Sequence, residues 1–142
     1  MALSIRSRDD FNHYINAFNN NDTPVYSAYY ASDCEMCLGP LALNGIDAIK
    51  QFFAVGRTQI SEHVDPELVL MDGNLLAITA TITFTAKVEL KEGFADIGPP
   101  VPQGGGYITV FAIFYELNDR GQFKKVYAGR VKPAKVFKAG KL

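Results

Sequence analysis

Three segments near the start of the chain place apolar residues three and four positions apart, which is the spacing of an amphipathic helix. Residues 7–22, SRDDFNHYINAFNNND, begin with Ser7 as a candidate cap and have acidic residues in the first turn. Residues 23–31, TPVYSAYYA, have proline at the first helical position. Residues 45–56, GIDAIKQFFAVG, carry isoleucine and phenylalanine on one face and are expected to end at Gly56. These patterns predict three helices.

Most of the remaining chain has the two-residue alternation of β-strands. ISEHVDPELVLMDG (60–73) ends in an Asp-Gly turn signal, and NLLAITATITFTAKVEL (74–90) alternates apolar residues with threonine. GYITVFAIFYELN (106–118) is rich in β-branched and aromatic residues, and KKVYAGRVKPAKVF (124–137) closes the chain. CEMCLG (34–39) predicts a short strand between the second and third helices.

Helices followed by long strands indicate an α+β fold, in which a strongly bent sheet wraps around the three N-terminal helices. No internal repeat or linker divides the sequence, so we expect one domain over residues 1–142. The strand at 106–118 is apolar on both faces and must be covered on both. The helices supply one cover. For the other we predict a second copy of the chain, that is, a homodimer through the outer face of the sheet.

Composition and charge narrow the class of protein. Hydrophobic residues make up 48% of the chain, charged residues 20%, and the net charge is −1, so we expect a globular protein that does not bind nucleic acid. No segment has the length of a transmembrane helix or the pattern of a signal peptide, so we expect no membrane association. Cys34 and Cys37 lie three apart on a predicted strand and would point to opposite faces, so they could not pair with each other. Free thiols indicate a reducing, cytoplasmic location.

One long connection, KEGFADIGPPVPQGGG (91–106), is rich in glycine and proline. Connections of this length are often functional, so we expect it to act as a lid or rim. The alternative is a disordered end of a hairpin.

The order of the elements resembles that of a known family. The stretches that carry the likeness are HYINAFNNND, YYASDCEM, NGIDAIKQFF, HVDPELVLMDGNLLAITA and YELNDRGQFKKV. Together they resemble the nuclear transport factor 2-like superfamily, SnoaL-like branch, over nearly the whole chain. The resemblance implies a cone-shaped α+β barrel of strongly bent mixed or antiparallel sheet. It does not choose an activity, because the superfamily holds ketosteroid isomerases, polyketide cyclases, dehydratases, epoxide hydrolases and non-enzymatic binding domains.

Ketosteroid isomerases offer the most informative comparison within this superfamily. By resemblance, Tyr14 matches the tyrosine that donates to the substrate oxyanion, and Tyr30 matches a second tyrosine that supports it. The third tyrosine of that network becomes Phe53. Leu38 stands at the position of the catalytic aspartate, and Ile113 stands at that of the second acid that binds the oxyanion. The resemblance therefore excludes the ketosteroid isomerase mechanism, although the hydrogen-bond donor Tyr14 remains.

The resemblance also suggests His63 as a replacement for the missing base. Dehydratase-like and SnoaL-like relatives often have a histidine at the start of this strand, pointing into the pocket. An imidazole can take and return a proton near neutral pH. The alternatives are a surface or satisfied core histidine, or a relay of His63 with Asp65. His13 is adjacent to Tyr14, projects from a different helix face, and should be exposed.

Further polar groups could line an otherwise apolar pocket. Tyr107 and Tyr115 share the side of their strand that the resemblance places inward, together with Ile113. By alternation Arg130 also falls inward, where it would bind an anionic or carbonyl group or be paired with a carboxylate. Glu35 should point away. The residues expected to bind substrate are Tyr30, Met36, Leu38, Phe53, Tyr107, Phe111, Tyr115 and Arg130.

These features predict a cofactor-independent lyase, isomerase or cyclase acting on a mid-sized apolar or aromatic carbonyl compound. Tyr14 would be the hydrogen-bond donor and His63 the general acid/base. No phosphate loop or metal-spaced cluster is present in the sequence, so we expect neither metal nor organic cofactor. An epoxide hydrolase is disfavoured because its Asp–Arg–Asp set has no counterpart at inward positions. The alternative is a non-catalytic small-molecule-binding or dimerisation module.

Overall fold

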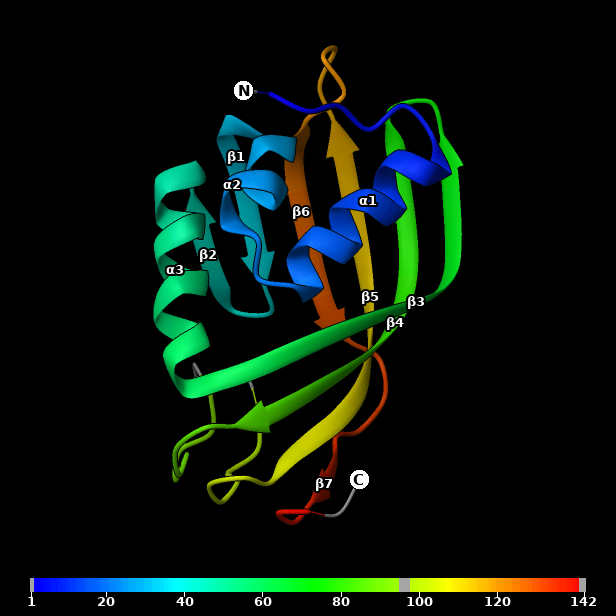
Figure 1. Ribbon diagram of the computed structural model, residues 1–142. Coiled ribbons are helices and arrows are strands. Elements are labelled where there is room, and N and C mark those ends of the chain that lie inside the picture. The colour runs from blue at the N-terminus through cyan, green and yellow to red at the C-terminus, as the bar shows by residue number, and fades with distance from the viewer. Residues whose placement is uncertain (1, 95–97, 141–142) are drawn as a thin grey trace.

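The computed structural model describes residues 2–94 and 98–140, and it has the expected α+β architecture (Figure 1). Its elements are α1 (Arg8–Asn19), α2 (Thr23–Tyr26), a short 3₁₀ helix (Ser27–Tyr29), β1 (Tyr30–Leu38), β2 (Leu41–Asn44), α3 (Ile46–Gln59), β3 (Ile60–Asp72), β4 (Leu75–Ala86), β5 (Gly106–Leu117), β6 (Phe123–Arg130) and β7 (Lys135–Phe137). None of the helices in the described residues is long and apolar enough to span a membrane.

The two longer helices follow the predicted pattern, with one difference at the end of α3. The Ser7 hydroxyl caps α1 by accepting a hydrogen bond from the backbone N–H of Asp10, and the apolar side of this helix is buried. Gly56 does not end α3, because the helix continues to Gln59. This glycine is buried, and the Phe94 ring packs against it so closely that an added Cβ would lie 2.9 Å from Cζ.

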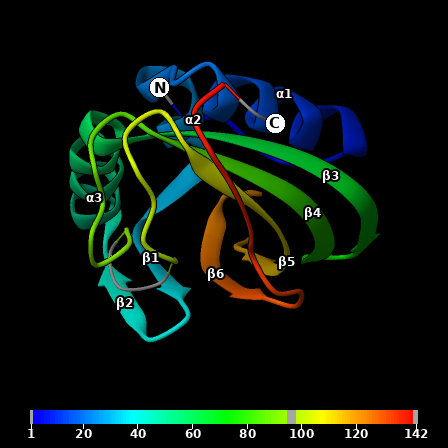
Figure 2. The same ribbon diagram turned by 90° about the horizontal axis from the view of Figure 1, so that it is seen from below.

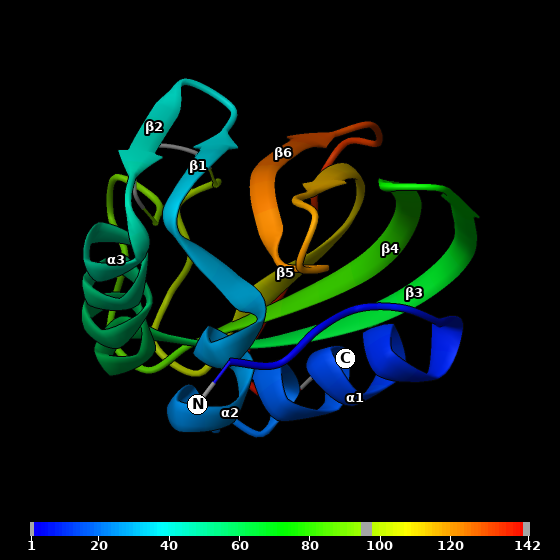
Figure 3. The same ribbon diagram turned by 90° about the horizontal axis from the view of Figure 1, so that it is seen from above.

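The sheet is mixed and open. Its strands run in the order β2-β1-β6-β5-β4-β3, with β7 paired to β5, and only the β1–β6 pair is parallel. The sheet curves strongly, with α1 lying across its concave side and α3 beside β1 and β2 (Figures 2 and 3). The bent sheet of the prediction is therefore confirmed, although it does not close into a complete barrel.

Alternation on β4 and β3 determines which side chains enter the concave side. On β4 the predicted inward residues Leu76, Ile78, Ala80, Ile82 and Phe84 are all buried, as is Ala86, and threonines alternate with them on the outer face. On the first half of β3, Ile60 and Val64 are buried whereas Ser61 is exposed. A bulge between Pro66 and Leu68 then interrupts the register. Even-numbered positions of β3 therefore point inward before the bulge.

Candidate functional site

A cavity lies between the helices and the concave face of the sheet. Its volume is about 80 Å³, and its walls are mostly aliphatic and aromatic side chains from α1, α3 and the inner sheet face. An outer hollow of about 290 Å³ adjoins it, and the two share Leu38, Phe111 and Ala128 as lining residues. The buried tyrosines line the inner cavity, and Arg130 lines the outer hollow.

Two tyrosine hydroxyls meet in the inner cavity. The hydroxyl oxygens of Tyr14 and Tyr30 are 2.5 Å apart and hydrogen-bonded, and both rings are buried. Burial raises the pKa of both phenols well above the ordinary value, so both remain protonated near neutral pH. In such a pair one hydroxyl donates to the other, and the accepting hydroxyl keeps its own proton for a third group. The pair can therefore donate one hydrogen bond to a ligand oxygen.

Glu62 places a carboxylate in the same cavity, and the sequence analysis missed it. It lies between Ile60 and Val64 on the inward side of β3 and lines the cavity. Burial raises the pKa of its carboxyl group from 4.5 to about 7, while the positive charge of Arg57 opposes this shift. No hydrogen bond or ion pair to the Glu62 carboxylate is formed within the described residues. The residue is only half-buried because part of its side chain borders the cavity.

Arg57 lies beside Glu62 without neutralising it through an ion pair. Its guanidinium donates to the backbone carbonyls of Glu62, at 3.1 Å, and Phe18, at 3.0 Å, and lies over the Phe18 ring. Its Nε is buried and has no hydrogen-bond partner in the part of the chain that the structure describes. Arg57 thus ties the end of α3 to α1 and β3, and its charge acts on the Glu62 carboxylate from nearby.

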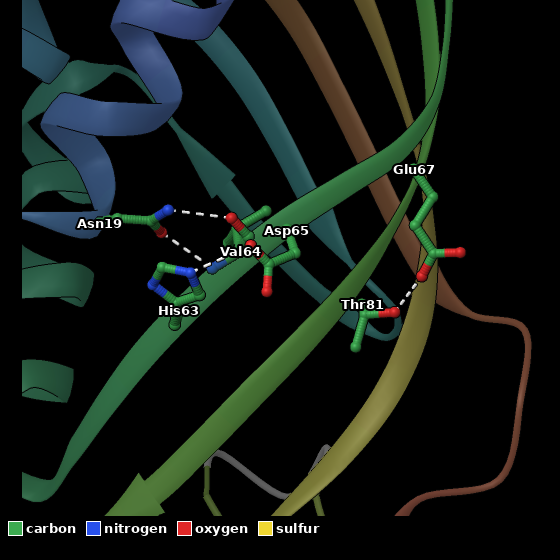
Figure 4. A network of polar contacts seen from close by, with 6 residues as sticks. All are labelled: Asn19, His63, Val64, Asp65, Glu67 and Thr81. Atoms are coloured by element: carbon green, nitrogen blue, oxygen red, sulfur yellow. Dashed lines mark hydrogen bonds and ion pairs between the residues drawn. The ribbon is translucent and has the colours of Figure 1, made fainter.

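His63 does not lie in the cavity, so its predicted position was wrong. Its side chain is 57% exposed on the other face of β3, and its Nε2 lies 3.1 Å from Oδ1 of Asp65 (Figure 4). Successive residues of a strand point to opposite faces. The residue of β3 that points into the cavity is therefore Glu62, the neighbour of His63. The His63–Asp65 contact exists, but on the solvent side.

A side chain of α1 holds this part of β3 in place. The Asn19 amide donates to the carbonyl of Val64 at 2.9 Å, and its oxygen accepts from the Val64 N–H at 2.8 Å (Figure 4). β3 is an edge strand, so these backbone groups have no neighbouring strand on that side. The two bonds fix the strand segment from which Glu62 enters the cavity.

The structure gathers most of the other predicted residues in the cavity. Those that line it are Tyr14, Tyr30, Met36, Leu38, Phe53, Tyr107, Phe111 and Tyr115. Arg130 is exposed and lies at the outer hollow instead. Burial raises the pKa of Tyr107 to about 12; the charge of Glu62 adds to this and that of Arg130 opposes it. His13 is exposed as predicted, and Glu35 is outside the cavity, where its carboxylate accepts a hydrogen bond from Tyr127.

The glycine- and proline-rich connection contributes one wall of the site. Phe94 is buried, lines the inner cavity and packs against Phe52, with ring centroids 5.7 Å apart. Leu90 and Val101 form an isolated bridge that draws the two ends of the connection together. The predicted lid also includes residues 95–97, which lie outside the described residues. Among the described residues, no three His, Cys, Asp or Glu side chains form a group that could hold a metal ion.

Comparisons with known proteins identify the fold. No protein-family model matches the sequence, and no curated protein matches it. A proposed polyketide cyclase from Silicibacter sp. has a similar structure, with a TM-score of 0.73 and 19% identity over 90% of this chain and 91% of that one. Another from Xanthomonas campestris pv. campestris has a TM-score of 0.69 and 22% identity over 84% and 85%. An LEH-like epoxide hydrolase from M. tuberculosis has a TM-score of 0.66 and 12% identity over 84% and 78%. The chain therefore has the NTF2-like fold.

Proposed function

We propose that the cavity is the active site of a cofactor-independent lyase, isomerase or cyclase that acts on a mid-sized apolar or aromatic carbonyl compound. The observation that carries this proposal is the hydrogen-bonded pair of Tyr14 and Tyr30 in a cavity whose walls are mostly apolar. Apolar walls would bind the carbon skeleton, and the hydroxyl pair would orient the carbonyl oxygen. The structural neighbours described as cyclases and as an epoxide hydrolase support enzymatic use of this fold.

Tyr14 is the proposed donor to the substrate oxygen, with Tyr30 donating to Tyr14. When a proton leaves the carbon next to a carbonyl group, negative charge develops on the oxygen. A neutral donor already in place stabilises that charge by about 3 kcal/mol in a site that excludes water. The same arrangement supports isomerisation, dehydration or intramolecular cyclisation, since each passes through an enol or enolate.

Binding of 2-naphthol tests the donor, because this two-ring phenol resembles an enol in shape and hydrogen bonding. We expect the fluorescence of 2-naphthol to change on binding and Tyr14→Phe to weaken binding about tenfold, the effect of one lost buried hydrogen bond. Tyr127→Phe is the matched control, since that ring lies outside the cavity. Equal affinity in the Tyr14→Phe variant and the wild type would contradict the donor role.

The second candidate is a non-catalytic binder of the same ligands. It is favoured by Leu38, an apolar side chain that lines the cavity where ketosteroid isomerases carry their base by resemblance. Isomerisation of 3-cyclohexenone to the conjugated enone separates the two functions, because only an enzyme produces the conjugated absorbance. Tight 2-naphthol binding without this turnover would favour the binder.

We further propose a homodimer formed through the outer face of the sheet. Directly paired residues make an apolar row across that face: Leu70, Ala77, Phe114 and Tyr127. Leu70 is 72% exposed and Phe114 58% exposed in the single chain. A cytoplasmic location is also proposed, supported by the two free cysteines on β1.

A further inference from the structure

We propose that Glu62 is the general acid/base of this cavity and takes the place of the carboxylate that is missing from β1. This inference rests on the proposed function and names the group that moves the proton. The side chain of Glu62 lies on the inward side of β3 and lines the cavity. Its carboxylate therefore borders the space that a ligand would fill.

Glu62 shares the cavity with several other polar side chains and interacts electrostatically with them. Burial raises the pKa of tyrosines on three different elements, and the charge of Glu62 adds to each rise: Tyr14 on α1, Tyr26 on α2, and Tyr107 and Tyr115 on β5. Arg57 approaches from α3. Glu62, Tyr14 and the two β5 tyrosines all line the cavity, so a ligand in that space would lie near both the carboxylate and the Tyr14 donor.

A structural role does not explain this carboxylate. Burying a charge costs stability unless it is paired and hydrogen-bonded, and the carboxylate has no such partner among the described residues. Arg57, the nearby cation, directs two of its N–H groups to backbone carbonyls. A group that weakens the fold and remains open to a cavity is typical of a functional site.

The acidity of Glu62 suits proton transfer near neutral pH. Burial raises the pKa of its carboxyl group to about 7, and the charge of Arg57 limits the rise. Both protonation states are then populated at neutral pH, so the same group can take a proton and return it. Above pH 7 the carboxylate acts as base, and below pH 7 the protonated form predominates.

The proposed reaction moves one proton through Glu62 and needs no further reactant. A Glu62 oxygen takes the proton from the carbon next to the carbonyl group, the C–H electron pair forms a C=C bond, and the carbonyl π pair moves to the oxygen that Tyr14 contacts. The protonated Glu62 then returns the proton to another carbon in an isomerisation. In a dehydration it returns the proton to a β-hydroxyl, whose C–O bond breaks to release water.

The ring opening of 5-nitrobenzisoxazole tests Glu62 without knowledge of the natural substrate. In this reaction a base takes the proton from a ring carbon, the N–O bond breaks, and coloured 2-cyano-4-nitrophenolate forms. We expect the wild-type rate to rise with pH and to level off above about pH 7. Glu62→Gln should lower it about 100-fold, which is the usual contribution of a general base.

Two control variants belong to the same strand. Glu67→Gln makes the identical chemical change at an exposed carboxylate that accepts a hydrogen bond from Thr81 (Figure 4). His63→Ala removes the exposed imidazole. Neither should change the rate, whereas a loss in His63→Ala comparable to that in Glu62→Gln would overturn the assignment.

Parallel titration with 2-naphthol separates this inference from the proposed function. Full elimination activity in a Glu62→Gln variant that binds 2-naphthol would overturn Glu62 as the base and leave the proposed site intact. Absence of wild-type elimination despite 2-naphthol binding would do the same. Failure of the wild type to bind 2-naphthol would instead count against the proposed function. If Glu62→Gln does not fold, the wild-type pH profile decides, since a flat profile from about pH 5 to 9 contradicts a base with this pKa.

Discussion

Burial of Glu62 makes the stability of the folded chain depend on pH. The pKa of its carboxyl group is about 7 in the folded state, against an ordinary value of 4.5. Between these two values the folded chain binds more protons than the unfolded chain. The contribution of Glu62 to the free energy of unfolding therefore falls as the pH rises from about 4.5 to 7, and the loss is complete above that range.

Replacement of Glu62 should accordingly stabilise the protein. We expect Glu62→Gln to raise the free energy of unfolding by about 1–3 kcal/mol at pH 8, because the amide carries no charge to bury. At pH 5 the gain should be much smaller, since wild-type Glu62 is then protonated. Urea denaturation at both pH values measures the difference, with Glu67→Gln as the exposed control. A variant less stable than the wild type at pH 8 would show that Glu62 serves the fold.

The polar residues of the site could be predicted from the sequence only in part. Tyr14 and Tyr30 were predicted because they match two tyrosines of ketosteroid isomerases by resemblance. Both line the cavity. Glu62 was not predicted because the resemblance indicated the neighbouring residue, His63, as the base. The signal was nevertheless present, since Ile60 and Val64 are apolar and Glu62 is the polar exception on their face of the strand.

The elements with strong periodicity were predicted well, and the connections between them less so. α1 and β4 have unbroken patterns, so their buried faces follow from the sequence. Gly56 misled the prediction because glycine commonly ends helices, whereas here it gives Phe94 room to approach α3. Because Gly56 and Phe94 lie 38 positions apart, the local sequence around Gly56 does not indicate this contact. The parallel pairing of β1 with β6 likewise depends on long-range contacts that the periodicity does not show.

The attachment of α1 to β3 should contribute measurably to stability. Asn19→Ala removes both hydrogen bonds to the backbone of Val64 and leaves its N–H and C=O groups without them. We expect the free energy of unfolding to fall by about 1–3 kcal/mol. Asn16→Ala is the control, because that side chain is exposed on the same helix. Urea denaturation measures the loss, and faster exchange of the Val64 amide hydrogen would locate it. Equal stability of the two variants would contradict the role of Asn19.

At the scale of the whole molecule, the two faces of the sheet differ in what covers them. The helices cover the concave face, where the apolar side chains of β4 and β5 are buried. On the outer face, β5 carries Ile108, Val110, Ala112 and Phe114, none of which is fully buried in the single chain. Apolar surface that crosses several strands without a cover is typical of an interface. The site lies on the concave side, so a partner on the outer face would leave it open.

The oligomeric state tests whether the outer face of the sheet is a dimer interface. We expect light scattering at micromolar concentration to give the mass of a dimer, and Phe114→Glu to give that of a monomer, because the charge would have to be buried at the centre of the apolar row. Val55→Glu, on the exposed side of α3, is the matched control and should remain dimeric. If the site is formed within one chain, monomeric Phe114→Glu should still bind 2-naphthol with wild-type affinity. A monomer mass for the wild type would contradict the interface, whereas loss of 2-naphthol binding on dissociation would show that the partner helps to form the cavity.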